Sequence, residues 1–371
     1  MSRVARTDFE EYGLSRGPFP VSGRLLLLTV DFEAFAPEML PLWLDAMHYW
    51  ATCAAQSRLH FCFFLAAEDA IRVLASGKKA SRDFLAAMRR FDDAGSLFYP
   101  HNHFVFDPAT GGKRLVAQEP ANPPSNYRKR KSLFYDAVYR HGLDLGDWLT
   151  TIRTTHQMLL ADAGCRIPRW PAFRAGGWDY GSTRQDVERY LDALRSAGFA
   201  IDSSACAGVF ETATWRVGSV FGSNAFMCRR DVIEVAPCWV DDCGLDGQRL
   251  LTLRRLMALR RHGRVWTGAP GVLVVVFHFD HLFHLGTGGA RRYFAVTDAA
   301  RVAERIRRTC RFFSAVRHLL RLESGTFESL RARSAWPMTP PAPGAPGVGD
   351  GSGPVGGDPA IQPARSAAER R

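Results

Sequence analysis

Short apolar runs alternate along the chain with amphipathic segments of helical period. Runs this short and this apolar predict strands that are buried on both faces, as in a parallel sheet covered by helices. The expected strands lie at residues 25–30, 59–65, 96–100, near 174, 199–202, 232–236 and 272–277. The expected helices lie at residues 81–93, 145–163, 184–197 and 299–322, the second ending at Gly164. This order of strand–helix units predicts an α/β fold.

The first of these runs, residues 25–30, ends in two carboxylates. Asp31 and Glu33 are two residues apart, and in an extended chain that spacing directs both side chains to the same side. Parallel α/β folds carry their chemistry at the carboxyl ends of strands. The pair is therefore a candidate catalytic or metal-binding pair, although a helix cap and a solvated loop charge would give the same pattern.

Three later predicted strands also end in side chains that can do chemistry. They are His101 with His103, Arg174 beside two glycines and Trp178, and His278 with Asp280. A carboxylate pair, a histidine pair, an arginine and a further histidine, all at strand ends, are the side chains expected of a metal-dependent hydrolase.

The content and order of these motifs resemble the polysaccharide deacetylases of carbohydrate esterase family 4, also called the chitooligosaccharide-deacetylase homology domain. The resemblance covers about residues 24–320. It implies a distorted (β/α)7 barrel that removes N-acetyl groups from sugars with the help of a divalent metal ion. In the first motif, Thr29-Val30-Asp31-Phe32-Glu33, it implies Asp31 as general base and Glu33 as a metal ligand. In the usual first motif of the family, the metal-binding acid directly follows the base. In this chain it comes one residue later and is Glu33.

The later motifs complete the set of roles that the resemblance implies. Arg174 would pair with Asp31 and hold it in its ionised form. His278 would act as general acid on the departing nitrogen, with Asp202, in the fourth motif, or Asp280 holding its imidazole.

The histidine motif departs from the family pattern, which has two metal-binding histidines four residues apart. His101 and His103 are two residues apart, a spacing that can still direct both to one metal ion from a strand end. Alternatively one histidine binds, and Tyr99 or Asp107 replaces the other. A third alternative is that the metal is lost, and the histidines form hydrogen bonds in a loop. With Glu33, His101 and His103 as ligands, zinc is the default ion, while Co, Ni, Fe and Mn remain open.

The expected substrate is an N-acetylated sugar or glycan precursor. Trp178 and Trp239, with Phe279, could stack on a pyranose ring or could form part of the barrel wall, and Asp280 is a further candidate for substrate binding. Two other functions stay open. One is a hydrolase of the same fold that acts on a non-sugar amide, and the other is an inactive barrel that binds a glycan or a partner.

Composition narrows the class of protein. The 371 residues are 46% hydrophobic and 23% charged, as in ordinary globular proteins. The net charge of +11 is not accompanied by zinc-finger spacing or an aromatic RNA-binding pattern, so we expect no nucleic-acid partner. We expect no transmembrane segment and no signal peptide, hence a cytoplasmic protein. Four of the cysteines, which are Cys53, Cys62, Cys165 and Cys310, fall in apolar or helical patterns that predict buried thiols.

The expected organisation is a single catalytic domain with two flanking segments. Residues 1–23 form an N-terminal extension, residues 24–336 the barrel, and residues 337–371 a Pro- and Gly-rich tail that we expect to be disordered. An insertion at about residues 107–145 contains the basic run 128–131. That run could be a clamp or lid for an acidic substrate, or a solvated loop. The sequence leaves the oligomeric state open.

Overall fold

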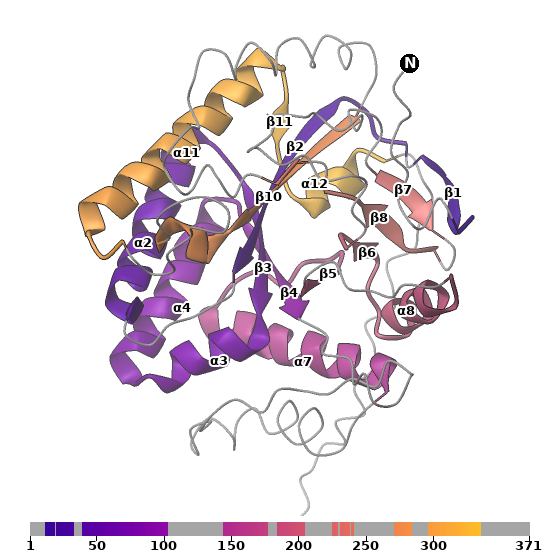
Figure 1. Cartoon of the computed structure of the whole chain (residues 1–371), viewed down its shortest axis with the longest axis horizontal. Coiled ribbons are helices and arrows are strands. Elements are labelled where there is room, and N and C mark those ends of the chain that lie inside the picture. The colour runs from indigo at the N-terminus through magenta and orange to yellow at the C-terminus, as the bar shows by residue number, and fades with distance from the viewer. Residues whose placement is uncertain are drawn as a thin grey trace, which may run out of the picture.

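The computed structural model describes residues 12–18, 20–32, 39–102, 144–176, 184–204, 225–228, 231–237, 239–240, 271–283 and 296–334. Strands lie at the centre and helices around them (Figure 1). The strands are β1 (Ser15–Pro18), β2 (Arg24–Phe32), β3 (Phe61–Ala66), β4 (Leu97–Asn102), β5 (Ala172–Ala175), β6 (Ile201–Asp202), β7 (Ala225–Cys228), β8 (Ile233–Val235), β9 (Trp239–Val240), β10 (Gly271–His278) and β11 (Glu323–Ser324). The helices are α2 (Leu40–Ser57), α3 (Ala67–Ala75), α4 (Lys78–Asp93), α7 (Leu145–Ala163), α8 (Arg184–Ser196), the 3₁₀ helix η5 (Phe279–Phe283), α11 (Ala299–Leu319) and α12 (Phe327–Ala332).

The core of the fold is a parallel sheet of seven strands that is nearly closed into a barrel. Their order is β8-β6-β5-β4-β3-β2-β10, and each neighbouring pair is parallel. The short strand β9 continues the sheet beyond β10, whereas β1 and β7 extend its other edge in antiparallel pairing. Helices α11, α2, α4, α3, α7 and α8 follow one another around the outside of the strands (Figure 1). The α/β barrel expected from the sequence is thus confirmed.

Along one of its edges, strand β2 pairs with two different strands. β11 pairs with its first half, at Leu25 and Leu26, and β3 pairs with its second half, from Leu28 to Phe32. The same β2 runs beside β10 over eight residues, from the pair Gly271 and Arg24 to the pair His278 and Asp31. All residues of β2 after Arg24 are buried, because helices cover one face and the barrel interior covers the other.

The apolar runs of the sequence form the expected elements with small shifts at their ends. Each of the seven predicted strands has its counterpart in the barrel sheet. The predicted helix at residues 145–163 is α7, and Gly164 follows it in the left-handed conformation (φ +62°), which a glycine adopts without steric cost. The side chain of Asp144 caps the other end by accepting a hydrogen bond from the backbone N–H of Asp147 (2.8 Å).

The structure also bears on the expected buried thiols, the expected absence of a membrane span and the expected flanking segments. The four cysteines predicted as buried thiols are buried and free. In the described part of the chain, no helix combines the length and apolar character needed to cross a bilayer. Strand β1 lies within the expected N-terminal extension and pairs with β7. Nearly all of the expected insertion, the tail at residues 337–371, and Glu33, His103 and Trp178 lie outside the described residues.

Candidate active site

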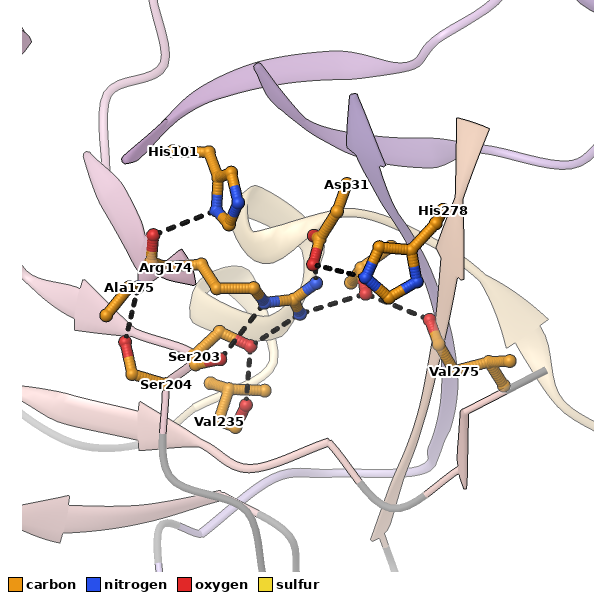
Figure 2. Close-up of polar contacts among 10 residues, drawn as sticks. Asp31, His101, Arg174, Ala175, Ser203, Ser204, Val235, Val275 and His278 are labelled. Atoms are coloured by element: carbon orange, nitrogen blue, oxygen red, sulfur yellow. Dashed lines mark hydrogen bonds and ion pairs between the residues drawn. The ribbon is translucent and has the colours of Figure 1, made fainter. Parts of the chain in front are cut away.

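The register of the sheet brings candidate residues together at the carboxyl ends of the strands. Asp31 at the end of β2 lies opposite His278 at the end of β10, and His101 of β4 lies opposite Arg174 of β5. Figure 2 shows the side chains of Asp31, His101 and His278 around that of Arg174. This is the end at which parallel α/β folds carry their chemistry, so four of the residues chosen from the sequence form one cluster.

Arg174 forms a buried ion pair with Asp31. Its Nη1 donates to Oδ1 of Asp31 over 2.6 Å, and the two side chains are 1% and 5% exposed. Ion pairs buried to this degree need good geometry and further hydrogen bonds to offset the loss of hydration. The remaining donors of Arg174 supply these further bonds.

Each of the three nitrogens of the Arg174 guanidinium group donates a hydrogen bond. Nε donates to the carbonyl oxygen of Ser203 (3.1 Å), and Nη2 donates to the hydroxyl oxygens of Thr29 and Ser203 (2.9 Å each). The two hydroxyls in turn donate to backbone carbonyl oxygens, that of Thr29 to Val275 (2.9 Å) and that of Ser203 to Val235 (2.8 Å) (Figure 2). One orientation of the arginine therefore satisfies every group in this network.

The arginine reaches Asp31 by crossing the barrel interior. Arg174 belongs to β5 and Asp31 to β2, and strands β3 and β4 lie between them in the sheet. Its guanidinium carbon lies 4.1 Å from the centre of the Phe64 ring on β3, close enough for a cation–π contact. Phe64 is itself the register partner of Asp31. The Phe64 ring thus packs against the guanidinium group of the ion pair.

His278 approaches the other oxygen of Asp31. Its Nε2 lies 3.8 Å from Oδ2 of Asp31, and its side chain is 22% exposed, the most accessible of this cluster. The two oxygens of Asp31 therefore have different neighbours, Arg174 for Oδ1 and His278 for Oδ2. The His278 ring also stacks on that of His281, with 5.0 Å between centroids.

Asp280 and Asp202 are the two carboxylates expected as partners of His278, and each has a defined contact. The carboxylate of Asp280 lies 4.0 Å from Nε2 of His281. Oδ1 of Asp202 accepts hydrogen bonds from the hydroxyls of Tyr190 (2.8 Å) and Ser204 (2.6 Å). These contacts link Asp280 to His281, and Asp202 to Tyr190 and Ser204.

Asp202 forms a buried network of its own with Glu234. The two residues are register partners on β6 and β8, and both are fully buried. Burial raises the pKa of Asp202 above its usual value near 3.8, while hydrogen bonds from Glu234, Ser204 and Tyr190 act in the opposite direction. The Ser204 hydroxyl also accepts from the backbone N–H of Ala175, next to Arg174. Asp202 thus supports the strand that carries the arginine.

His101 is held in an orientation that suits a metal ligand. The side chain is buried, and its Nδ1 lies 3.0 Å from the carbonyl oxygen of Arg174. A carbonyl can only accept, so Nδ1 carries a proton, and Nε2 is the nitrogen through which a neutral imidazole would bind a metal ion. Histidine ligands of metals are usually fixed by such a bond from their second nitrogen. The described residues contain no group of three His, Cys, Asp or Glu side chains that could hold a metal, while Glu33 and His103 lie outside them.

Several residues of the site were not among those chosen from the sequence. They are Thr29, Phe64, Ser203, Glu234 and His281. The alternation of a strand gives a signal for Thr29, since it lies two residues before Asp31 on the same face. In the fourth motif the sequence points to Asp202, whereas the next residue, Ser203, contacts Arg174.

The chain is similar to polysaccharide deacetylases and family 4 carbohydrate esterases of known structure. A putative polysaccharide deacetylase from Mycobacterium smegmatis is 14% identical with a TM-score of 0.42, covering 88% of this chain and 97% of that one. A family 4 carbohydrate esterase from Streptomyces lividans is 13% identical with a TM-score of 0.34, covering 86% and 100%. PdaA, a family 4 carbohydrate esterase from Bacillus subtilis, is 9% identical with a TM-score of 0.36, covering 87% of each chain. No model of a known protein family matches the sequence, and none of the curated proteins matches it.

Proposed function

We propose that this protein is a metal-dependent hydrolase that removes an N-acyl group, in particular an N-acetyl group, from a sugar or glycan precursor. One observation carries the proposal. The Asp31 carboxylate is fixed at the carboxyl end of the barrel, with Oδ1 bound by Arg174 and Oδ2 facing the partly exposed His278. An amide hydrolase needs both a base and an acid within one site, and this pair offers them.

Asp31 is proposed as the base that removes a proton from the attacking water. Its Oδ1 is bound by Arg174, which leaves Oδ2 on the side of His278 to receive the proton. The hydrogen bonds of Arg174 to Thr29 and Ser203 fix the direction of the carboxylate. A base held in place before the reaction loses no free energy in being oriented during it.

His278 is proposed as the acid that protonates the leaving nitrogen. An amine leaves an amide slowly unless its nitrogen gains a proton as the bond breaks. Partial exposure of His278 fits this role, because the donor must reach the substrate and regain its proton from solvent. The stacked ring of His281 limits the rotation of the imidazole.

A divalent metal ion, with zinc as the default, is proposed to bind His101, Glu33 and His103. The orientation of His101 through the Arg174 carbonyl fits such a ligand. When bound, the ion would polarise the acyl carbonyl and lower the pKa of the attacking water.

The sugar is proposed to lie against Trp178, Trp239 and Asp280. In β9, Trp239 pairs with Val275, on the strand that ends in His278, and Asp280 follows that strand by two residues. Indole rings stack on the apolar faces of pyranoses, and a carboxylate accepts from sugar hydroxyls.

Acetate release and metal content of the purified protein test the proposal together. The substrate panel contains a free N-acetylated hexosamine, a nucleotide-linked N-acetyl sugar, an N-acetyl oligosaccharide and, as non-sugar amides, a cyclic ureide and a formamide. We expect acetate from at least one sugar, a bound divalent ion, and no release by D31N. Turnover of the non-sugar amides alone would favour the second class of hydrolase. A protein without metal and without turnover would favour the inactive, ligand-binding barrel.

A further inference from the structure

A cavity of about 1020 Å³ opens at the end of the barrel opposite Asp31. Its lining includes Arg24, the first residue of β2, and residues that precede β3 and β4. Arg24 and Asp31 are seven residues apart on one strand, which separates them by roughly 23 Å. The cavity is therefore distinct from the candidate active site, and its volume suits a small-molecule ligand.

The lining of this cavity is strongly basic. It contains five arginines, which are Arg24, Arg58, Arg317, Arg321 and Arg333. Among the described residues of the lining, two are carboxylates, Asp93 and Glu323, so five positive charges and two negative ones give these residues a formal charge of +3. Asp93 is bonded to Arg89, and Glu323 is bonded to Arg333.

Two of the five arginines donate hydrogen bonds to carbonyl oxygens at the C-terminal ends of helices. Nη1 of Arg317 donates to the carbonyl oxygen of Arg58 (2.6 Å), just after α2, and Nη1 of Arg24 donates to that of Leu320 (3.3 Å), just after α11. Carbonyls at helix C-termini need such donors. Across the described residues, the side chains of Arg58 and Arg321 have neither a carbonyl nor a carboxylate partner, and both are exposed.

Backbone preference does not account for arginine at these two positions. Arg58 has φ +50° and Arg321 has φ +51°, the left-handed region that favours glycine or asparagine. Each residue follows the last turn of a helix, α2 or α11, where such a conformation is common. At both positions, arginine is unfavourable for the left-handed backbone conformation, yet it places a cationic side chain at the cavity.

Of the two histidines in the lining, His60 and His318, the partly buried His60 does not add to the charge of the cavity. Nδ1 of His60 lies 3.0 Å from the carbonyl oxygen of Ser324, so this nitrogen carries the proton. Burial lowers the pKa of His60, and the positive charge of Arg317 lowers it further. The positive potential of the cavity comes from the arginines.

We propose that this cavity is a second site, which binds a ligand that carries a diphosphate group. Guanidinium groups match the oxygens of phosphates in pairs, and two arginines without carboxylate partners can each bind one phosphate group. The diphosphate can be inorganic or belong to a nucleotide, and the two sources share this chemistry.

Isothermal titration of the full chain tests the site with inorganic phosphate, pyrophosphate and uridine diphosphate as probes. The test variant is R58Q/R321Q, in which glutamine keeps the backbone conformation and much of the side-chain length. The control variant is R301Q/R311Q, which removes the same charge from two exposed arginines of α11 that do not line the cavity. Thermal melting establishes that all three proteins are folded.

We expect pyrophosphate to bind the wild type more tightly than phosphate does. R58Q/R321Q should weaken pyrophosphate binding at least about tenfold, since each lost charge-assisted hydrogen bond accounts for about that factor, and the control should stay within about twofold. Tighter binding of uridine diphosphate than of pyrophosphate would assign the site to a nucleotide, and equal binding would assign it to the diphosphate alone. The proposal is overturned if neither diphosphate binds the wild type, or if both double variants weaken binding equally.

Discussion

Nη1 of Arg174 lies 2.6 Å from Oδ1 of Asp31, across the interior of the barrel. The partners come from β5 and β2, which are 143 positions apart in sequence and are not neighbours in the sheet. Both side chains are almost fully buried, so neither charge can be hydrated if the other is removed. The pair therefore joins opposite walls of the barrel and orients the proposed base.

Replacement of Arg174 by Gln should destabilise the protein by about 3 to 5 kcal/mol, because it leaves the Asp31 carboxylate buried without a cation. Urea unfolding of the variant and the wild type measures this free energy. In R174Q/D31N the uncompensated charge is gone, so part of the loss should be recovered. R184Q is the control, because Arg184 pairs with Glu188 on the surface of α8, where such pairs contribute little. An R174Q protein as stable as the wild type would contradict the role given to this pair.

His101→Ala should reduce the affinity for zinc at least about tenfold, since it removes a proposed ligand together with its bond to the Arg174 carbonyl. A metal that binds only the folded protein stabilises it, by about 2.7 kcal/mol at a free concentration one hundred times Kd. Elemental analysis and the zinc-dependent shift in melting temperature are the two measurements. The control is H48A, on α2 and outside the site. The metal assignment fails if H101A keeps the wild-type metal content and the wild-type shift.

Asp202→Asn should become more stable relative to the wild type as pH rises above 4. Burial raises the pKa of Asp202, so the folded protein binds this proton more tightly than the unfolded chain does. At pH values between the usual pKa near 3.8 and the raised pKa, Asp202 is ionised in the unfolded chain but still protonated in the folded protein. The stability of the wild type therefore falls as pH rises through this range. The amide oxygen of Asn can still accept from Tyr190 and Ser204.

Unfolding free energies of D202N and wild type at several pH values between 4 and 8 measure this difference. D192N, at an exposed carboxylate of α8, shows how much of the effect comes from removing any carboxylate. If the difference for D202N is constant over this pH range, burial does not set the proton affinity of the Asp202 and Glu234 pair.

The barrel strands could be predicted from the sequence because their signal is local. A run such as that in β10 is apolar at every position, since both faces of the strand are buried. Helix α2 was not predicted. Its apolar residues, among them Trp43, Met47 and Trp50, are mixed with further apolar residues around the helix, so the helical period is weak.

The site could be predicted only where its residues lie at the carboxyl end of a strand. Asp31, His101, Arg174 and His278 all do so, and the register of the sheet brings them together. Ser203 and Phe64 contact the arginine through the curvature of the barrel, which depends on the pairing of distant strands. The same curvature gives Asp202 its neighbours, Tyr190 and Glu234, and no local pattern of the sequence specifies it.

The central claim is that Asp31 and His278 act as base and acid in the hydrolysis of an amide. Its most direct test compares D31N and H278A on an N-acetyl sugar from the panel and on an activated acetyl ester, whose leaving group needs no proton. On the amide, both variants should lose about 10²- to 10⁴-fold in turnover while keeping their metal. On the ester, H278A should return to within about tenfold of wild type, and D31N should keep its full loss. Equal losses on both substrates in both variants would contradict the acid role of His278, and full activity of D31N on the amide would contradict the base role of Asp31.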